Sequence, residues 1–327
     1  MKLTPDALKL DTKRTADAIA ETLRETVVGT LKRRGVVVGL SGGIDSSVTA
    51  GLAVRALGKQ HVLGLLMPET DSASETLGLS RSVAAALGID TVHEDITPIL
   101  SAARCYERRD DAIRKVIPEY GPAWKSKIVL PNVLESDAIR FYSVVVQGPD
   151  GRSQKIRMTP EAYLGVVAAT NFKQRTRKML EYYHADRLNY CVAATPNRLE
   201  YDQGFFVKGG DGLGDVKPIA HLYKTQVYAI AEEVGIPAGV RSRRPTTDTY
   251  SLPQSQDEFY FSLPYEQMDL CLWAKNRGVG ADEAAAALHL TVDQVERVYK
   301  DIEQKRRTTR YLHLRPQLIE PVPEVSG

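Results

Sequence analysis

Apolar positions in the N-terminal third of the chain follow two patterns that alternate. Residues 14–34 carry an apolar residue every three or four positions and end in a basic run followed by Gly35, which predicts an amphipathic helix. Short continuous apolar runs predict buried strands, and helical segments separate them. The apolar runs are 36–40 and 62–66, segment 89–92 is expected to form a third strand, and the expected helices are 45–57 and 75–87. This alternation predicts an α/β fold, a doubly wound parallel sheet flanked by helices.

The pattern changes in the rest of the chain. Residues 103–160 contain several prolines, and segment 141–158, with the turn Gly148-Pro149-Asp150-Gly151, predicts a β-hairpin. Further expected elements are helix 161–183, strand 188–194, helix 222–234 and C-terminal helices 264–276, 281–288 and 292–307. The proline-containing tail after Leu314 is expected to be loose. We expect one α/β domain over residues 1–250 with an insert at about 103–160, and a helical extension of that domain over 251–327.

Composition limits the class of protein. The 327 residues are 43% hydrophobic and 26% charged, as in water-soluble globular proteins. A net charge of +2 is too small to indicate binding to nucleic acid or to an anionic membrane. Cys105, Cys191 and Cys271 are far apart, which argues against structural zinc and for a reducing compartment. The charged N-terminal segment and the lack of a long apolar run predict a cytoplasmic protein without a membrane span.

A glycine-rich run, Ser41-Gly42-Gly43-Ile44-Asp45-Ser46-Ser47, separates strand 36–40 from helix 45–57. Such a loop directs backbone N–H groups and a helix N-terminus at an anion, usually a phosphate. No lysine follows, so the run is not the common nucleotide loop that ends in Gly-Lys-Ser/Thr. The aspartate beside a phosphate cradle indicates a cation, most simply Mg²⁺, between them. The alternative is an ordinary glycine turn before a helix.

Other polar segments follow predicted strands or open predicted helices. Glu200 lies just after strand 188–194, where it could act as a second Mg²⁺ ligand beside Asp45. Lys224 opens the next helix, where its charge could reach phosphate. Arg175 and Arg177 are two positions apart in a helix, so they do not share a face. Taken alone, their segment is more typical of a solvated basic surface.

The glycine run resembles the pyrophosphate loop of ATP-pyrophosphatases, which cleave ATP between the α- and β-phosphates. The order of the polar segments closely resembles the NAD synthetase family, whose members amidate the nicotinic acid ring of deamido-NAD. The matching segments are 41–46, 171–177, 194–200, 204–215, 222–224 and 243–246. Six ordered motifs are far more specific than any one of them.

The resemblance implies a role for particular residues. Those implied to bind ATP or pyrophosphate are Leu40, Ser41, Gly42, Gly43, Ile44, Asp45, Ser46, Ser47, Thr195, Lys224 and Thr246. Those implied to bind deamido-NAD are Asn171, Arg175, Glu200, Lys208 and Asp215. Asp45 and Glu200 would hold Mg²⁺. Those implied in catalysis are Asp45, Lys208, Asp215, Lys224 and Thr246.

The implied reaction passes through an acyl-adenylate. Transfer of AMP to the carboxylate expels pyrophosphate, and ammonia then displaces AMP to leave NAD. Too few residues precede the first strand for a fused glutaminase domain, so we expect free ammonia or ammonia from a separate glutaminase. The resemblance also implies a homodimer.

Four departures from the family pattern leave the substrate open. Ala194, Gly209, Leu66 and Arg243 stand where the family usually has Gly, Tyr, Arg and Lys. An adenylating amide ligase for another carboxylate is therefore one alternative. A second is a nucleic-acid-binding protein, because residues 281–295 resemble a helix-turn-helix followed by a basic run. The balanced charge favours two packed helices instead. The lack of paired cysteines disfavours sulfur transfer to RNA.

Overall fold

Four parallel strands form the central sheet, in the order β3-β2-β1-β7. The computed structural model describes residues 3–73, 75–130, 133–134, 142–243, 245, 250–256, 260–261 and 263–325. The strands are β1 (Val36–Gly39), β2 (Val62–Leu66), β3 (Asp90–His93) and β7 (Cys191–Ala193). The chain builds the sheet outward from β1 to β3 and then returns to the other side of β1. The ends of β1 and β7 therefore form the point where strand order reverses, the usual place for a ligand crevice.

Helices cover both faces of this sheet. One face is covered by α1 (Thr12–Arg24), α2 (Ile44–Leu57), α3 (Thr76–Leu87) and α8 (Lys224–Ala231), and the other by α4 (Thr97–Ala102), α5 (Cys105–Arg114) and α6 (Pro160–Leu188). Val36 and Val38 pack on the first side, whereas Val37 packs on the second. This two-sided burial explains why β1, β2 and β7 are continuous apolar runs, whereas the edge strand β3 is mostly exposed. The predicted doubly wound α/β fold is confirmed.

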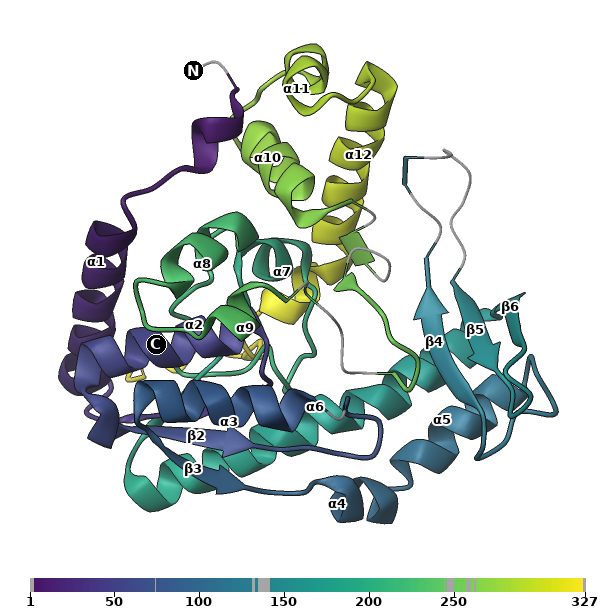
Figure 1. Ribbon diagram of the computed structural model, residues 1–327, viewed down its shortest axis with the longest axis horizontal. Helices are drawn as coiled ribbons and strands as arrows, with labels where there is room; N and C mark the ends of the chain where they lie inside the picture. Colours follow the sequence, from purple (N-terminus) through teal and green to yellow (C-terminus); the bar gives the residue numbers. More distant parts are fainter. Residues whose placement is uncertain are drawn as a thin grey trace.

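A second, antiparallel sheet occupies the region expected to be an insert. It contains β4 (Lys125–Val129), β5 (Ser143–Gln147) and β6 (Ser153–Arg157), in that order. The hairpin predicted over 141–158 is confirmed as β5 and β6, although Phe141 lies outside the described residues. Helices α4 and α5 and strand β4 were not predicted. Val144 and Val146 pack on α5 and α6 at the end of the molecule opposite α1 (Figure 1).

Helix α6 links the two sheets. Its 29 residues span about 44 Å. It begins one residue before the predicted segment 161–183 and ends five residues after it. The Thr159 side chain caps its first turn, and Asn189 ends it in a left-handed conformation. Because α6 ends later than predicted, the strand expected over 188–194 is shortened to β7 (Cys191–Ala193). The C-terminal half of α6 packs under the parallel sheet, and its N-terminal half packs under the insert (Figure 1).

The C-terminal helices agree with their predicted positions. They are α10 (Tyr265–Asn276), α11 (Ala281–Leu288) and α12 (Val292–Thr309), and they share a core with Leu3 and Leu8. The remaining short elements are 3-10 turns at Pro5–Leu8, Lys59–His61 and Arg310–His313, a π turn at Glu25–Thr30, and helices α7 (Arg198–Gln203) and α9 (Ala238–Arg241). The π turn ends the helix expected over 14–34. In the described part of the chain, no helix combines the length and hydrophobicity of a membrane span.

Candidate active site

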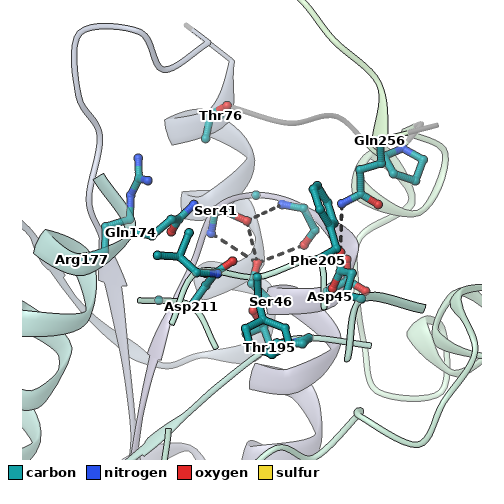
Figure 2. A pocket seen from close by; sticks show the side chains of 18 of the residues that line it. Ser41, Asp45, Ser46, Thr76, Gln174, Arg177, Thr195, Phe205, Asp211 and Gln256 are labelled. Atoms are coloured by element: carbon teal, nitrogen blue, oxygen red, sulfur yellow. Dashed lines mark hydrogen bonds between the residues drawn. The ribbon is translucent and has the colours of Figure 1, made fainter. Parts of the chain in front are cut away.

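A cavity of about 410 Å³ lies at the C-terminal edge of the parallel sheet. Its lining includes the ends of β1 and β2 and the residues after β7, together with one face of α6. Figure 2 shows Ser41, Ser46 and Asp211 near its centre, with Asp45 and Gln256 on one side and Gln174 and Arg177 on the other. The cavity therefore lies at the predicted crevice.

The glycine loop is folded against the start of α2. Gly42 has a positive φ of 71°, and a Cβ there would lie 2.9 Å from the Thr76 carbonyl oxygen, so only glycine fits. The Ser41 and Ser46 hydroxyls are 3.1 Å apart, and the Ser47 hydroxyl donates to the Gly43 carbonyl at 2.7 Å. No side chain caps α2 at Gly43. The first N–H groups of the helix therefore remain available to an anion.

Asp45 connects this loop to α8. Its carboxylate accepts hydrogen bonds from the Asn197 amide at 3.0 Å and from the ammonium of Lys224. The Lys224 side chain is only 2% exposed. Burial lowers the pKa of Lys224, but the carboxylates of Asp45 and Glu200 outweigh that effect and raise it overall. A protonated lysine is thus held at the loop, although it comes from a distant part of the sequence.

Glu200 supplies a second buried carboxylate. It accepts hydrogen bonds from the backbone N–H of Asn197 at 3.1 Å and from the side chain of Gln256 at 3.0 Å. Burial, and then the negative charge of Asp45, raise the pKa of Glu200 to about 8. Two neighbouring carboxylates of this kind suit a divalent cation. No cluster of three or more His, Cys, Asp or Glu that could hold a metal occurs among the described residues, so further ligands would come from substrate and water.

Most of the predicted site residues meet in the cavity. Those that line it are Leu40, Ser41, Gly42, Gly43, Ile44, Asp45, Ser46, Asn171, Thr195, Glu200 and Lys224. Ser47 is fully buried behind the loop, and its hydroxyl donates a hydrogen bond to the loop backbone at Gly43. Thr246 lies outside the described residues.

Three predicted residues lie outside the cavity and are exposed. Arg175 donates to the Lys208 carbonyl at 3.2 Å, and the Lys208 ammonium donates to the Tyr311 carbonyl at 2.9 Å. Asp215 accepts from the Val192 N–H at 2.8 Å, beside β7. The structure does not bring these three to the reacting end of the site. Their assignment to catalysis or to deamido-NAD stays a prediction.

Several cavity residues were not predicted as site residues. Asn197 caps α7 and donates to Asp45. Its spacing to Glu200, Asn-x-x-Glu after a strand, is a capping-box signature that could have identified it. Arg177 also lines the cavity, on the opposite face of α6 from Arg175, as the spacing of the two arginines predicted. Asp211 is held by the Val207 N–H at 2.7 Å, and burial raises its pKa.

The loop after β2 is fixed by buried charges. The ammonium of Lys173, on α6, lies 3.0 Å from Glu69 and 2.6 Å from Asp71. Arg109, on α5, donates to the same Asp71 oxygen at 2.6 Å. Because Met67 and Ser72 of this loop line the cavity, the network sets one wall of the site. These ion pairs join residues that are far apart in the sequence, so no local sequence pattern predicts them.

Comparison with known proteins identifies the family. The NAD synthase family model matches residues 15–117 and 138–310. The chain belongs to the NAD synthase family. A protein of Rhizobium meliloti (strain 1021) named NH(3)-dependent NAD(+) synthetase is 60% identical over 321 residues, which cover 98% of this chain and 96% of that protein. A Thermotoga neapolitana protein of the same name is 32% identical over 297 residues, covering 88% and 94%.

Solved structures agree with this family assignment at the level of the fold. NMN synthetase from Francisella tularensis superposes with a TM-score of 0.64 at 19% identity, covering 95% of this chain and all of that one. An NH3-dependent NAD synthetase from Campylobacter jejuni gives a TM-score of 0.61 at 22% identity, with the same coverage. Residues 118–137, which include β4, fall outside the NAD synthase family model.

Proposed function

We propose that this chain catalyses the ATP-dependent amidation of deamido-NAD with ammonia through an acyl-adenylate, giving NAD, AMP and pyrophosphate. The observation that carries the proposal is the meeting of Asp45, Glu200 and Lys224 beside the glycine loop, in a member of the NAD synthase family. The related protein of Rhizobium meliloti (strain 1021), 60% identical, is named for this activity.

In the first half-reaction a carboxylate oxygen of deamido-NAD bonds to the α-phosphorus of ATP. The bond from that phosphorus to the bridging oxygen breaks, and pyrophosphate leaves with the electron pair. Negative charge then builds up on the departing phosphates, where the N–H groups of residues 41–47 and the ammonium of Lys224 stabilise it. Thr195 and Thr246 are proposed to complete this phosphate site.

Mg²⁺ fits the donor set of this site. One or two protein carboxylates plus substrate phosphates is the usual binding mode of Mg²⁺, and Asp45 and Glu200 supply two. Bound there, it would neutralise phosphate charge as a Lewis acid. The same cation would relieve the repulsion between Asp45 and Glu200 that contributes to the raised pKa of Glu200.

In the second half-reaction ammonia attacks the acyl carbon. The bond from carbon to the AMP oxygen breaks, AMP leaves, and the nitrogen loses its extra proton to yield the amide. Asn171, on the cavity wall, is proposed to orient the nicotinate end of deamido-NAD. Arg175, Lys208 and Asp215 are proposed to bind its outer part, because they are exposed beside the cavity rather than in it. Ammonia would arrive free or from a separate glutaminase.

A homodimer through α6 is part of the proposal. Met179 and Tyr183 lie one helical turn apart on α6 and are 54% and 59% exposed. Two apolar side chains this exposed on one face of a long helix support its use as an interface. Three cysteines that are free and buried support a reducing compartment, so we place the enzyme in the cytoplasm.

The test is the product balance. Purified protein with ATP, Mg²⁺, deamido-NAD and ammonium should form NAD, AMP and pyrophosphate in equal amounts. Glutamine in place of ammonium should give no NAD. The Asp45→Asn variant should form all three products much more slowly than the wild type. Release of ADP, or no NAD at all, would contradict the proposal.

Another carboxylate is the second candidate substrate. Residues 118–137 lie outside the family model, and the insert that contains them also brings Tyr142 to the cavity. If AMP forms only with another nucleotide-linked carboxylic acid, this candidate replaces deamido-NAD while the adenylation chemistry stands.

A further inference from the structure

A buried ion pair in the cavity takes no part in the proposed adenylation and amidation steps. Lys178 and Glu181 lie one turn apart on α6, and both line the cavity. Their side chains are 5% and 8% exposed, and the Lys178 ammonium donates to Oε2 of Glu181. Burying two charges is costly and adds little stability on its own. A pair kept at the wall of a ligand cavity therefore invites a functional explanation.

The other carboxylate oxygen of Glu181 faces the ends of two strands. A Cβ placed on Gly39, the last residue of β1, would lie 2.8 Å from Oε1 of Glu181 and 3.2 Å from the terminal methyl of Met67. None of the described residues donates a hydrogen bond to this oxygen. Arg177 fixes Met67 by donating to its carbonyl at 3.3 Å. Oε1 of Glu181 is thus held beside Gly39, which precedes the first residue of the phosphate loop, Ser41, by two positions.

The chemistry of this place limits its ligand. A carboxylate paired with an ammonium only accepts hydrogen bonds and repels phosphate, so the ligand must bring a donor. ATP offers donors only in its nucleoside. Gly39, which has no side chain, and the thioether of Met67 form an apolar border beside Oε1 of Glu181, and methionine packs well against aromatic rings. These surroundings suit a planar base more than a ribose.

We propose that Oε1 of Glu181 accepts a hydrogen bond from the exocyclic amino group of the adenine of ATP and thereby selects ATP over 6-oxo purine nucleotides. The inference rests on the proposed function in taking ATP as the nucleotide. Burial raises the pKa of Glu181, and the ion pair with Lys178 opposes that rise and holds the carboxylate in place. In inosine triphosphate a carbonyl oxygen replaces the amino group, so two acceptors would face each other.

The test measures binding rather than turnover. Calorimetry of the full chain with Mg²⁺ should show inosine triphosphate binding about 10- to 100-fold more weakly than ATP, the range expected for one hydrogen bond to a charged group. In Glu181→Gln the amide can donate to the 6-oxo group, so the difference should fall below about threefold. Glu161→Gln, the same change at an exposed site on the same helix, should keep the wild-type difference.

A double variant protects the test against misfolding. Lys178→Met with Glu181→Leu removes both charges, leaves none unpaired, and should also abolish the preference for ATP. Equal binding of the two nucleotides by the wild type would overturn the inference. So would a Glu181→Gln variant that changes discrimination against 2′-deoxy-ATP instead. Nucleotide binding is measured without deamido-NAD. The preference for ATP can therefore be interpreted even if the amidation assay fails.

Discussion

At the scale of residues, the decisive contact joins Asp45 to Lys224. Asp45 lies in the first turn of α2 and Lys224 in the first turn of α8, and both helix starts face the cavity. The backbone that carries the Lys224 side chain is also held in place, because Asp269 accepts a hydrogen bond from the Lys224 N–H at 3.2 Å. A preorganised ammonium of this kind stabilises charge that develops on phosphate without rearranging during the reaction.

Replacing Lys224 by methionine should lower the rate of AMP formation by about 100-fold or more. The variant loses the cation that faces the phosphates while it keeps most of the buried volume. The measurement is kcat for AMP release with deamido-NAD and ammonium. Lys275→Met, which removes an ion-paired lysine that does not line the cavity, is the matched control. Activity of Lys224→Met within about threefold of the wild type would contradict the role given to this residue.

Asp269 should give stability a distinctive pH dependence. Burial raises its pKa from 3.8 to about 7, although it accepts two backbone hydrogen bonds. Between these values the folded state binds more protons than the unfolded chain, so stability falls as pH rises. The advantage of the wild type over Asp269→Asn should therefore shrink from about pH 4 to pH 7, by at most about 1.4 kcal/mol per pH unit. Urea unfolding at several pH values measures it, and a growing advantage would contradict the assignment.

At the scale of elements, the strand–loop–helix unit of β1 and α2 defines the site. The apolar run and the glycine pair in the sequence were enough to predict this unit, because its geometry depends on neighbouring residues. Strand β4 was missed for the opposite reason. It is stabilised by pairing with β5, of which Ser143 matches Val129 in register, and such distant pairing leaves little trace in local pattern.

The same distinction applies to the site. Asp45, Glu200 and Lys224 could be predicted from the order of motifs, and the structure brings them together. The Lys178–Glu181 pair could not, since a charged pair at this spacing is typical of a solvated helix face. Its burial depends on the sheet, because Gly39 at the end of β1 packs against Glu181.

Replacing Gly42 by alanine tests the loop as an element. The positive φ and the 2.9 Å approach to the Thr76 carbonyl should make this change cost about 1–3 kcal/mol of stability and weaken ATP binding. Gly78→Ala, in the neighbouring helix α3 with open space around its Cβ, should stabilise the protein by about 0.5–1 kcal/mol. Thermal unfolding and ATP titration measure both. Equal effects of the two substitutions would show that the loop has no special conformation.

At the scale of the whole molecule, α6 contacts the cavity and both sheets and carries the face proposed for the dimer. Its inner face lines the cavity with Asn171, Arg177 and Glu181, and its outer face exposes Met179 and Tyr183. The parallel sheet and the insert pack on opposite halves of the same helix (Figure 1). A partner bound along the outer face would therefore lie one helix away from the substrates, close to Arg175 and Lys208.

A charge placed on that outer face should disrupt the proposed dimer. Met179→Lys with Tyr183→Lys should halve the mass measured by light scattering, because two buried lysines would lack partners at an apolar interface. Val292→Lys, at an exposed apolar position on α12, should leave the mass unchanged. A wild-type protein that is monomeric at all concentrations would contradict the dimer.

An isotope label on the substrate carboxylate tests the acyl-adenylate mechanism by showing where one oxygen atom goes. Deamido-NAD whose carboxylate carries a heavy oxygen isotope is incubated with the protein, ATP, Mg²⁺ and ammonium, and the products are analysed by mass spectrometry. If the carboxylate attacks the α-phosphorus and ammonia displaces AMP, one labelled oxygen from each substrate must leave in AMP. Label in pyrophosphate or in inorganic phosphate, or NAD formed without label in AMP, would contradict the acyl-adenylate mechanism.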